Sequence, residues 1–183
     1  PVLDGEWDAV VVPSASCSGS LRHQAALVAT DQGEAALASK AKALSKKTYD
    51  LSELLVNVLG LEDVGAYFPH RVTYHTTCHS LRIARVGDTP IRLLNNVDGL
   101  DYIPLPEADV CCGFGGTFSL KNPETSASML SDKMANIIST GAEVLVSGDY
   151  SCLMSIGGGL SRNRSGSRSL HLEEIIAGTV HEP

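Results

Sequence analysis

The chain has 183 residues, of which 43% are hydrophobic and 19% charged, so it can bury a sizeable core and is not a disordered chain. The 14 Lys and Arg residues against 21 Asp and Glu give a formal net charge of −7, which argues against nucleic acid as the main partner because phosphate binding needs a basic face. An apolar run of about 18 residues, as a membrane span requires, is absent, and we expect no membrane span and no signal peptide.

The first third of the chain predicts one strand followed by helices. The sequence "DAVVVPSAS" at residues 8–16 reads as a buried strand that ends in a polar turn. Residues 19–29 have a helical pattern. Residues 34–60 contain two helical stretches, with apolar residues three and four apart and Gly60 as the stop signal. Because the chain begins with Pro1 rather than Met, we expect it to be a fragment of a longer protein.

The remaining two thirds predict strands that alternate with helices. The predicted strands lie at residues 71–75, 100–105 and 142–148, with a short one near 168, and the predicted helices at 79–86, 89–97 and 121–141, with one at the end of 168–178. Asn122 can cap the helix that begins at Pro123. Residues 157–169, rich in Gly, Ser and Arg, are expected to be a mobile loop rather than a phosphate-binding loop. This alternation is typical of an α/β fold with a parallel sheet flanked by helices.

Two segments of the chain resemble each other. Residues 8–17 and 143–152 both start with an acidic residue, continue through a buried strand and reach a cysteine nine residues later. This similarity predicts two related repeats, of which the first is truncated. We expect residues 1–60 to form the C-terminal part of the first repeat with its linking helices, and residues 71–183 to form a complete second domain.

The five cysteines are the candidate functional residues: Cys17, Cys78, Cys111, Cys112 and Cys152. Their sparse distribution fits a reducing compartment, so we expect a cytoplasmic protein. A single cysteine is often just a small core residue. However, the last four follow predicted strands, and the carboxyl ends of parallel strands meet at one edge of a sheet. We therefore expect these four thiols to converge, with Cys17 placed similarly on the other sheet.

The adjacent cysteines in "CCGFGG" favour a metal centre. A disulfide between Cys111 and Cys112 would close a strained ring. Four thiolates suit either a zinc ion or an iron–sulfur cluster, and neighbouring thiolates suit a cluster because they can reach different irons. We expect backbone N–H groups of the loop to point at sulfur, and the glycines to let the main chain approach closely; these glycines are Gly113, Gly115 and Gly116.

Polar side chains surround Cys78 in "YHTTCHSLR". His75 and His79 are expected to be either metal ligands or hydrogen-bonded second-layer groups, and for each histidine on its own an ordinary structural role is an open alternative. Arg82 is expected either to offset the negative charge of a cluster or to be a surface residue.

The three segments "YHTTCHSLR", "CCGFGG" and "GDYSCLMSIGG" together resemble the cysteine-rich CCG domain. There are 32 residues between Cys78 and Cys111, and 39 between Cys112 and Cys152. The domain occurs in heterodisulfide reductase, in the iron–sulfur subunits of glycolate- and glycerol-3-phosphate-oxidising enzymes, and in the lactate utilization protein A family, which the sequence resembles most. The full pattern ends in C-x₂-C, whereas Ser155 stands at the last position here.

The resemblance implies an iron–sulfur electron-transfer subunit of a cytosolic system that oxidises L-lactate to pyruvate. It implies a cluster, of the 4Fe-4S type, held by Cys78, Cys111, Cys112 and Cys152, with Cys17 belonging to a second site that is incomplete in this chain. It also implies sister subunits as partners and a small 2-hydroxy acid as the indirect substrate.

Three alternatives stay open. One is the iron–sulfur subunit of a glycolate oxidase. Another is a zinc-binding interaction module without a redox role. The third is a thiol–disulfide enzyme that uses Cys111 and Cys112, although the C-x₂-C motif of such enzymes is absent. The sequence shows no paired general acid and base, so we expect part of the substrate chemistry to lie on a partner or cofactor.

Overall fold

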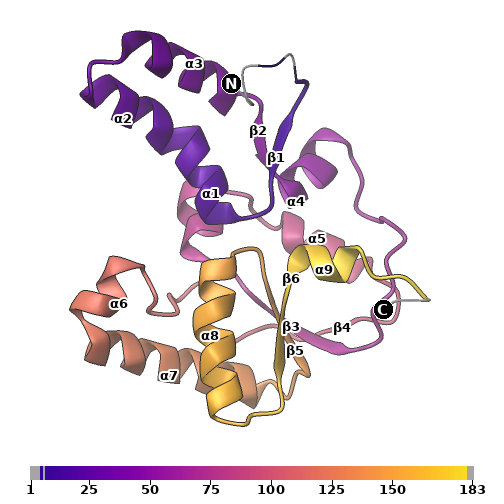
Figure 1. Ribbon diagram of the computed structural model, residues 1–183. Helices are drawn as coiled ribbons and strands as arrows, with labels where there is room; N and C mark the ends of the chain where they lie inside the picture. The colour runs from indigo at the N-terminus through magenta and orange to yellow at the C-terminus, as the bar shows by residue number, and fades with distance from the viewer. Residues whose placement is uncertain (1–4, 6, 181–183) are drawn as a thin grey trace.

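The computed structural model describes residues 5 and 7–180, and in this part of the chain two parallel sheets are present (Figure 1). The larger sheet has four strands in the order β4-β3-β5-β6, and all of its pairings are parallel. Its strands are β3 (Arg71–His75), β4 (Asp101–Tyr102), β5 (Val144–Ser147) and β6 (Arg168–His171). The predicted α/β class with parallel sheets flanked by helices is confirmed.

Helices cover both faces of the larger sheet. Helices α5 (Thr89–Asn95) and α9 (Leu172–Ile176) pack on one face, and α7 (Pro123–Ser139) and α8 (Tyr150–Arg162) pack on the other. The central strand β5 is buried along its whole length because successive side chains enter opposite layers. Val144 and Val146 belong to the core beneath α5 and α9, whereas Leu145 belongs to the core beneath α7 and α8.

The smaller sheet pairs β1 (Val10–Val12) with β2 (Thr48–Asp50) in parallel. A helical run connects them: α1 (Ala15–Gly19), the π-helical segment η2 (Ser20–Gln24) and α2 (Ala25–Asp31), followed by α3 (Ala35–Ser45). Figure 1 shows α2 and α3 as a hairpin that projects from the rest of the molecule. After β2 come α4 (Leu51–Glu53) and the π-helical segment η3 (Leu54–Val58).

The two helical stretches predicted over residues 34–60 are present as α3 and α4–η3, but strand β2, which the sequence analysis missed, separates them. The strand has only three residues, and its partner β1 lies far away in the sequence, so no local alternation marks it. Pairing with β1 forms the strand, and local contacts support it. The Thr48 hydroxyl donates to the carbonyl of Leu44 at 2.9 Å, and the carboxylate of Asp50 accepts from the amide of Ser52 at 3.0 Å.

The segment 157–169 is not the mobile loop that its composition predicts. Helix α8 continues to Arg162, and β6 begins at Arg168. Two of its three glycines stand where side chains would collide: a Cβ at Gly157 would overlap Ser169 Oγ, and a Cβ at Gly159 would lie 2.5 Å from Met134 Sδ. Glycine therefore lets α8 lie close to β6 and α7, a requirement that composition alone does not reveal.

The two sheets are joined where the carboxyl ends of β1 and β5 meet. Helix α1 packs against the π-helical segment η4 (His79–Ala84), which follows β3. The amide of Ala15 donates to the carbonyl of Gly148 at 3.1 Å, and the amide of Ser16 donates to Asp149 Oδ2 at 2.8 Å. The turn after β1 is thus tied to the turn before α8.

The other predicted elements of the second half are present, with small shifts at their ends. The helix predicted for 121–141 is α7, which begins at Pro123; Asn122 occupies the capping position, but its side chain makes no capping hydrogen bond. The short helix α6 (Thr117–Lys121) precedes it. Within residues 5 and 7–180, no helix combines the length and apolar character that crossing a membrane requires. The two predicted repeats, 1–60 and 71–183, include some residues that the structure does not describe, namely 1–4, 6 and 181–183.

Candidate metal centre

Four of the five cysteines lie just beyond the carboxyl ends of strands in the larger sheet. Cys78 follows β3 and immediately precedes η4. Cys152 is in the first turn of α8, directly after β5. Cys111 and Cys112 lie in the loop between β4 and α6. The sheet topology therefore places Cys78 and Cys152 at one edge, and the loop after β4 brings Cys112 to Cys152.

Three buried side chains form the inner group of the site: His75, Cys112 and Cys152. The sulfurs of Cys112 and Cys152 lie 3.5 Å apart and share a hydrogen bond. One ring nitrogen of His75 and these two sulfurs all lie within 4.8 Å of one another. The exposed fractions are 0% for His75, 2% for Cys112 and 7% for Cys152. This geometry suits a metal ion or one corner of a cluster, because imidazole and thiolate are ligands of zinc and iron.

Cys78 and Cys111 form the outer pair of the site and are both half-buried. Each affects the other groups electrostatically: Cys111 and Cys112 both act on Cys78, and Cys78 in turn acts on Cys152. The outer pair therefore lies within electrostatic range of the inner group, but its sulfurs are not among the donor atoms that lie within 4.8 Å of one another.

His75 reaches the inner group because of its position in β3. Side chains alternate along a strand, and Val72 and Tyr74 belong to the core beneath α5 and α9. Thr73 and His75 must point to the other face, where the core contains Cys112 and Cys152. The alternation is visible in "RVTYH" and could have distinguished His75 from His79, which lies beyond the strand in η4.

The buried sulfurs differ in how readily they ionise. The hydrogen bond with Cys152 lowers the pKa of Cys112 to about 4, against the effect of burial, and the nearby His75 ring adds to the lowering. The same hydrogen bond and burial raise the pKa of Cys152. Burial, with the like charges of neighbouring thiols, raises the pKa of Cys78 to about 11, although Arg82 opposes the shift. One thiolate is therefore ready at neutral pH, and a bound cation would be needed to ionise Cys78 and Cys152.

The glycine-rich loop supports the sulfurs through its backbone. The amide of Gly113 donates to Cys111 Sγ at 3.3 Å, and the amide of Phe114 faces Cys112 and lowers its pKa. In the described hydrogen bonds, Gly115 and Gly116 serve another purpose, because their carbonyls accept from the first amides of α6. Gly113 thus matches the expected sulfur donor, while Gly115 and Gly116 begin the next helix.

Lys133 is a buried charge near the site that the sequence analysis missed. Its side chain is 1% exposed and its ammonium donates to the carbonyl of Glu107. Burial lowers the pKa of Lys133, while nearby negative charges, including those of Cys111 and Cys112, oppose the shift. The sequence pattern could have revealed this buried lysine, since Lys133 interrupts an apolar helical face formed by Leu130, Met134 and Ile137.

Asp149 is a second buried group that the sequence analysis missed. It is fully buried and caps α8, the helix that carries Cys152. Its carboxylate accepts from the amide of Ser151 at 3.0 Å, from the hydroxyl of Ser151, and from the amide of Ser16 at 2.8 Å. Burial alone raises the pKa of Asp149, but these hydrogen bonds outweigh burial and lower it.

Replacing Asp149 with Ala is expected to lower the free energy of unfolding of the metal-free protein by about 2–3 kcal/mol at pH 7, because two partly buried amides lose their acceptor. A carboxyl whose pKa is lower in the folded state contributes fully above its unfolded value of about 4 and loses this contribution at lower pH. Urea unfolding at pH 7 and about pH 3 should therefore show a smaller acid loss in the variant. The exposed Asp31→Ala variant is the control; equal losses in both variants would contradict this role.

Cys17, His79 and Arg82 lie outside the inner group. Cys17 is exposed in α1, and the described contacts do not bring it to the four thiols. His79 and Arg82 both belong to η4, where Arg82 is exposed and acts on Cys78 by its charge. These three sequence-predicted residues are therefore not part of the inner group of His75, Cys112 and Cys152.

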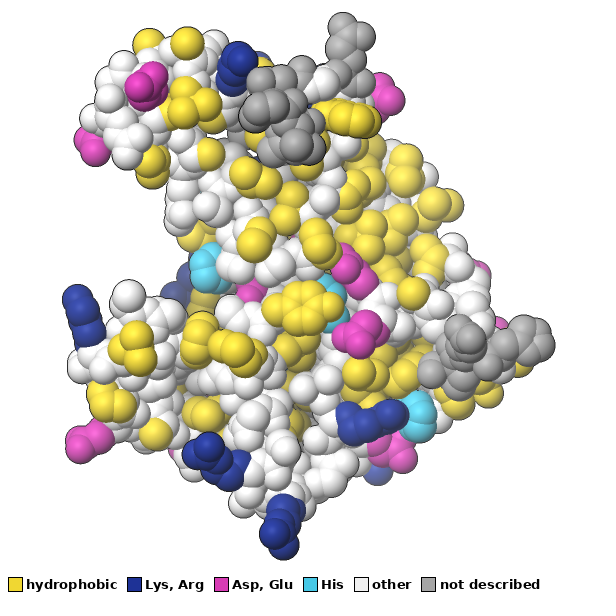
Figure 2. Space-filling model, in the orientation of Figure 1, with side chains coloured by type: hydrophobic (Ala, Val, Ile, Leu, Met, Phe, Trp, Pro, Cys, Tyr) yellow, Lys and Arg dark blue, Asp and Glu magenta, His cyan; other side chains and the backbone are white. Residues whose placement is uncertain are grey.

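An open cleft adjoins the site along η4. It has a volume of about 530 Å³ and basic character, being lined by Arg22, His23, Glu53, Arg82, Ile83, Ala84 and Arg85. Figure 2 shows the molecule hollowed between the α2–α3 hairpin and α6, with basic side chains inside the hollow. Arg22 is paired with Glu53 at 2.6 Å.

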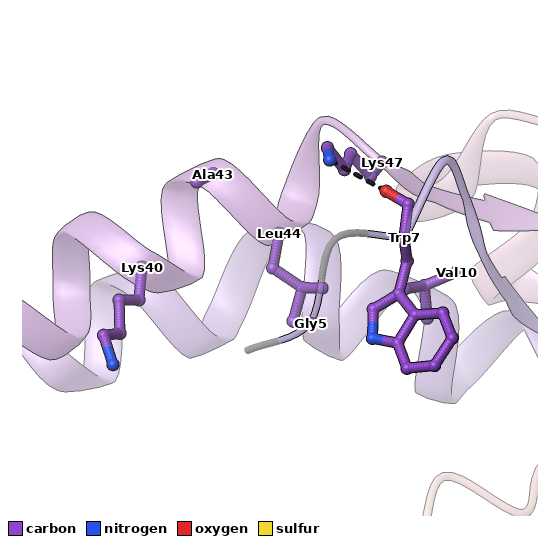
Figure 3. Close-up of a pocket in the computed structure, with 7 residues that line it drawn as sticks. All are labelled: Gly5, Trp7, Val10, Lys40, Ala43, Leu44 and Lys47. Atoms are coloured by element: carbon purple, nitrogen blue, oxygen red, sulfur yellow. Dashed lines mark hydrogen bonds between the residues drawn. The ribbon is translucent and has the colours of Figure 1, made fainter. Parts of the chain in front are cut away.

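Another cavity, of about 280 Å³, lies at the opposite end of β1 (Figure 3). Its lining consists of Gly5, Trp7, Val10, Lys40, Ala43, Leu44 and Lys47. In Figure 3 the Trp7 ring lies beside Val10, and Lys47 donates to the carbonyl of Trp7 at 2.8 Å. The lining contains no thiol, imidazole or carboxylate, so this cavity does not compete with the cysteine site as a metal centre.

The residues present fit a metal or cluster. All five cysteines are free, so no vicinal disulfide occupies the site. Neither ring nitrogen of the buried His75 has a hydrogen-bond partner among the described residues. At Gly113, φ is +84° and a Cβ would lie 2.6 Å from the carbonyl oxygen of Ser126, so only glycine lets the chain pass this close to α7. A convergent set of soft donors, with an unpartnered imidazole, suits a metal–sulfur centre.

Comparison with known families agrees with this description. The CCG cysteine-rich domain matches residues 72–157, the part of the chain that holds the inner group and the outer pair. The chain therefore carries a CCG cysteine-rich domain, and its cysteine and histidine cluster belongs to that domain.

Similarity to individual proteins extends over nearly the whole chain. The sequence is 43% identical over 169 residues to lactate utilization protein A of Lysinibacillus sphaericus, covering 92% of this chain and 73% of that protein. It is 44% identical to the protein of the same name from Geobacillus sp., with 92% and 70% covered, and 44% identical to that of Bacillus subtilis, with 94% and 71% covered. The chain belongs to the lactate utilization protein A family.

Proposed function

We propose that this chain is an iron–sulfur electron-transfer subunit of a cytosolic system that oxidises L-lactate to pyruvate. The close grouping of His75, Cys112 and Cys152, with Cys78 and Cys111 in electrostatic range of it, is the observation that carries the proposal. The name shared by the similar proteins supports lactate as the substrate of the system, in preference to the glycolate alternative.

We propose Cys78, Cys111, Cys112 and Cys152 as the thiolate ligands of one 4Fe-4S cluster. When bound, such a cluster supplies reversible one-electron transfer. The protein would hold its sulfurs in place by the Gly113 and Phe114 amides and would exclude water on the side of the inner group. The half-buried outer pair would leave the other side accessible for electron exchange with a partner.

Sister subunits of the same system are the proposed partners. Oxidation of lactate to pyruvate releases two electrons and two protons, whereas a single cluster accepts one electron at a time. The hydroxyacid would therefore react on a sister subunit, and this chain would carry the electrons onward. The name of the similar proteins is consistent with a place in lactate metabolism.

We also propose that the chain contains two related repeats, with residues 1–60 as the final part of the first and residues 71–183 as the second. Helices α1 and α8 each follow a strand and carry a cysteine, Cys17 or Cys152, as their third residue. Strands β2 and β6 each pair in parallel with the strand before that helix and end at a capping residue, Asp50 or His171. Cys17 would then belong to a second centre.

Anaerobic purification of the protein, with iron, acid-labile sulfide and zinc measured per chain, tests this function. We expect about four iron and about four sulfide per four-thiol site, with a broad visible absorption that bleaches on reduction. One zinc per chain without sulfide would reject the electron-transfer function in favour of a zinc-binding interaction module.

A further inference from the structure

We propose that His75 is itself a ligand of the centre, bonded through one ring nitrogen as a fifth protein donor beside the four thiolates. The inference rests on the proposed function for the identity of the metal, but its geometric basis is independent of that identity. Three observations support it: the position of the ring, the absence of hydrogen-bond partners for its nitrogens, and the backbone contacts of the residue.

The ring lies where a ligand would have to lie. Its nitrogen is within 4.8 Å of the sulfurs of both Cys112 and Cys152. Two donors on one metal are separated by less than twice a metal–ligand bond of about 2.0–2.3 Å, so small adjustments of these side chains bring all three donors onto one ion.

The two ring nitrogens have no other described role. The side chain is 0% exposed, and neither nitrogen has a hydrogen-bond partner among residues 5 and 7–180. A buried polar group without a partner is unfavourable, so a purely structural residue here would be expected to be apolar. The other buried histidine of the described residues, His171, is partly satisfied: its Nδ1 accepts from the amide of Glu173 at 3.3 Å and caps α9, and only its Nε2 lacks a described partner.

The backbone of His75 does not explain the imidazole either. Its carbonyl accepts from the hydroxyl of Ser147 at 3.1 Å, and the residue pairs with Ser147 across the sheet, contacts that any residue type can make. A neutral imidazole does have one advantage over a further thiolate: it adds a donor without adding negative charge to a buried site that already holds four sulfurs. Imidazole ligation also raises the reduction potential of an iron–sulfur centre.

Nitrogen hyperfine spectroscopy tests this inference. The full chain would be produced with ¹⁵N-histidine, purified anaerobically and reduced to a paramagnetic state for pulsed electron paramagnetic resonance. We expect a nitrogen coupling several times larger than that of a backbone amide near sulfur, changed by the isotope. It should be lost in His75→Ala and kept in His79→Ala, the matched control on η4.

Wild-type protein without a histidine coupling would overturn the ligand assignment, whether or not the variants fold. A coupling that persists in His75→Ala would overturn it as well. As a second measurement, His75→Cys should retain iron and have a lower reduction potential, because an anionic donor replaces a neutral one; an unchanged potential would contradict ligation.

The failure of this inference can be separated from that of the proposed function. Iron and sulfide without histidine coupling would reject only the His75 ligand. Zinc without sulfide would reject the electron-transfer function, and X-ray absorption at the zinc edge would then decide on His75, since Zn–N bonds of about 2.0 Å are distinct from Zn–S bonds of about 2.3 Å. In that case, a zinc-edge spectrum that shows only Zn–S bonds would reject His75 as a ligand.

Discussion

Replacing Cys112 with Ser is expected to remove most of the bound iron, with an affinity at least about tenfold weaker. Cys112 is buried between Cys152 and His75 and has the lowest thiol pKa of the site, so it is the thiolate most ready to bind. Serine has nearly the same size, but its hydroxyl does not ionise at neutral pH and is a poor ligand for iron. Iron per chain and thermal midpoint, measured together on anaerobic protein, check the result.

Cys17→Ser is the matched control for this variant. Cys17 is exposed in α1 and outside the four-thiol group, so its replacement should leave the iron of that group unchanged. If Cys112 were only a core residue, its replacement would cost about 1–3 kcal/mol of stability for a buried hydroxyl and no iron. Unchanged iron in Cys112→Ser would remove this residue from the ligand set.

Replacing Gly113 with Ala should lower the free energy of unfolding of the metal-free protein by about 2–5 kcal/mol. Two costs add. The positive φ of +84° is unfavourable for alanine by about 1–2 kcal/mol. The new methyl would also lie 2.6 Å from the carbonyl oxygen of Ser126 and 2.8 Å from Met129 Cβ in α7, and relieving such an overlap costs about 1–3 kcal/mol. Urea unfolding measures the loss.

Gly116→Ala separates these two costs. Gly116 has a similar positive φ, of +56°, but no atom lies within 4 Å of a Cβ built there. This control should lose only the conformational part, about 1–2 kcal/mol. Equal losses in the two variants would show that close approach to α7 is not what requires glycine after the adjacent cysteines.

The architecture of the second half was accessible from the sequence because its signals are local and strong. The unbroken apolar run "VLV" at 144–146 is typical of a strand covered on both faces, and β5 is buried along its length. Strand ends place cysteines at one edge in any parallel sheet, so the neighbourhood of Cys78, Cys112 and Cys152 followed from topology.

The features that could not be predicted depend on contacts between distant segments. The three residues of β2 form a strand because β1 pairs with them, not because of their own pattern. Gly157 and Gly159 look like loop residues until the packing of Ser169 and Met134 against α8 is known. For His75, both a ligand role and a second-layer role fit the sequence, since a strand pattern predicts the face of a residue but not which sulfurs meet it there.

The hydrogen bonds from the turn after β1 to Gly148 and Asp149 have a consequence for cooperativity. A two-stranded sheet is marginally stable by itself, so β1 and β2 rely on contacts with the rest of the molecule. When this sheet opens, Asp149 loses the amide of Ser16, and the first turn of α8 loses part of what holds its capping residue. Local unfolding of the small sheet and loosening of Cys152 are therefore one sub-global event, with a shared rate of amide hydrogen exchange. Movements of the projecting α2–α3 hairpin can in this way reach the metal centre without touching it.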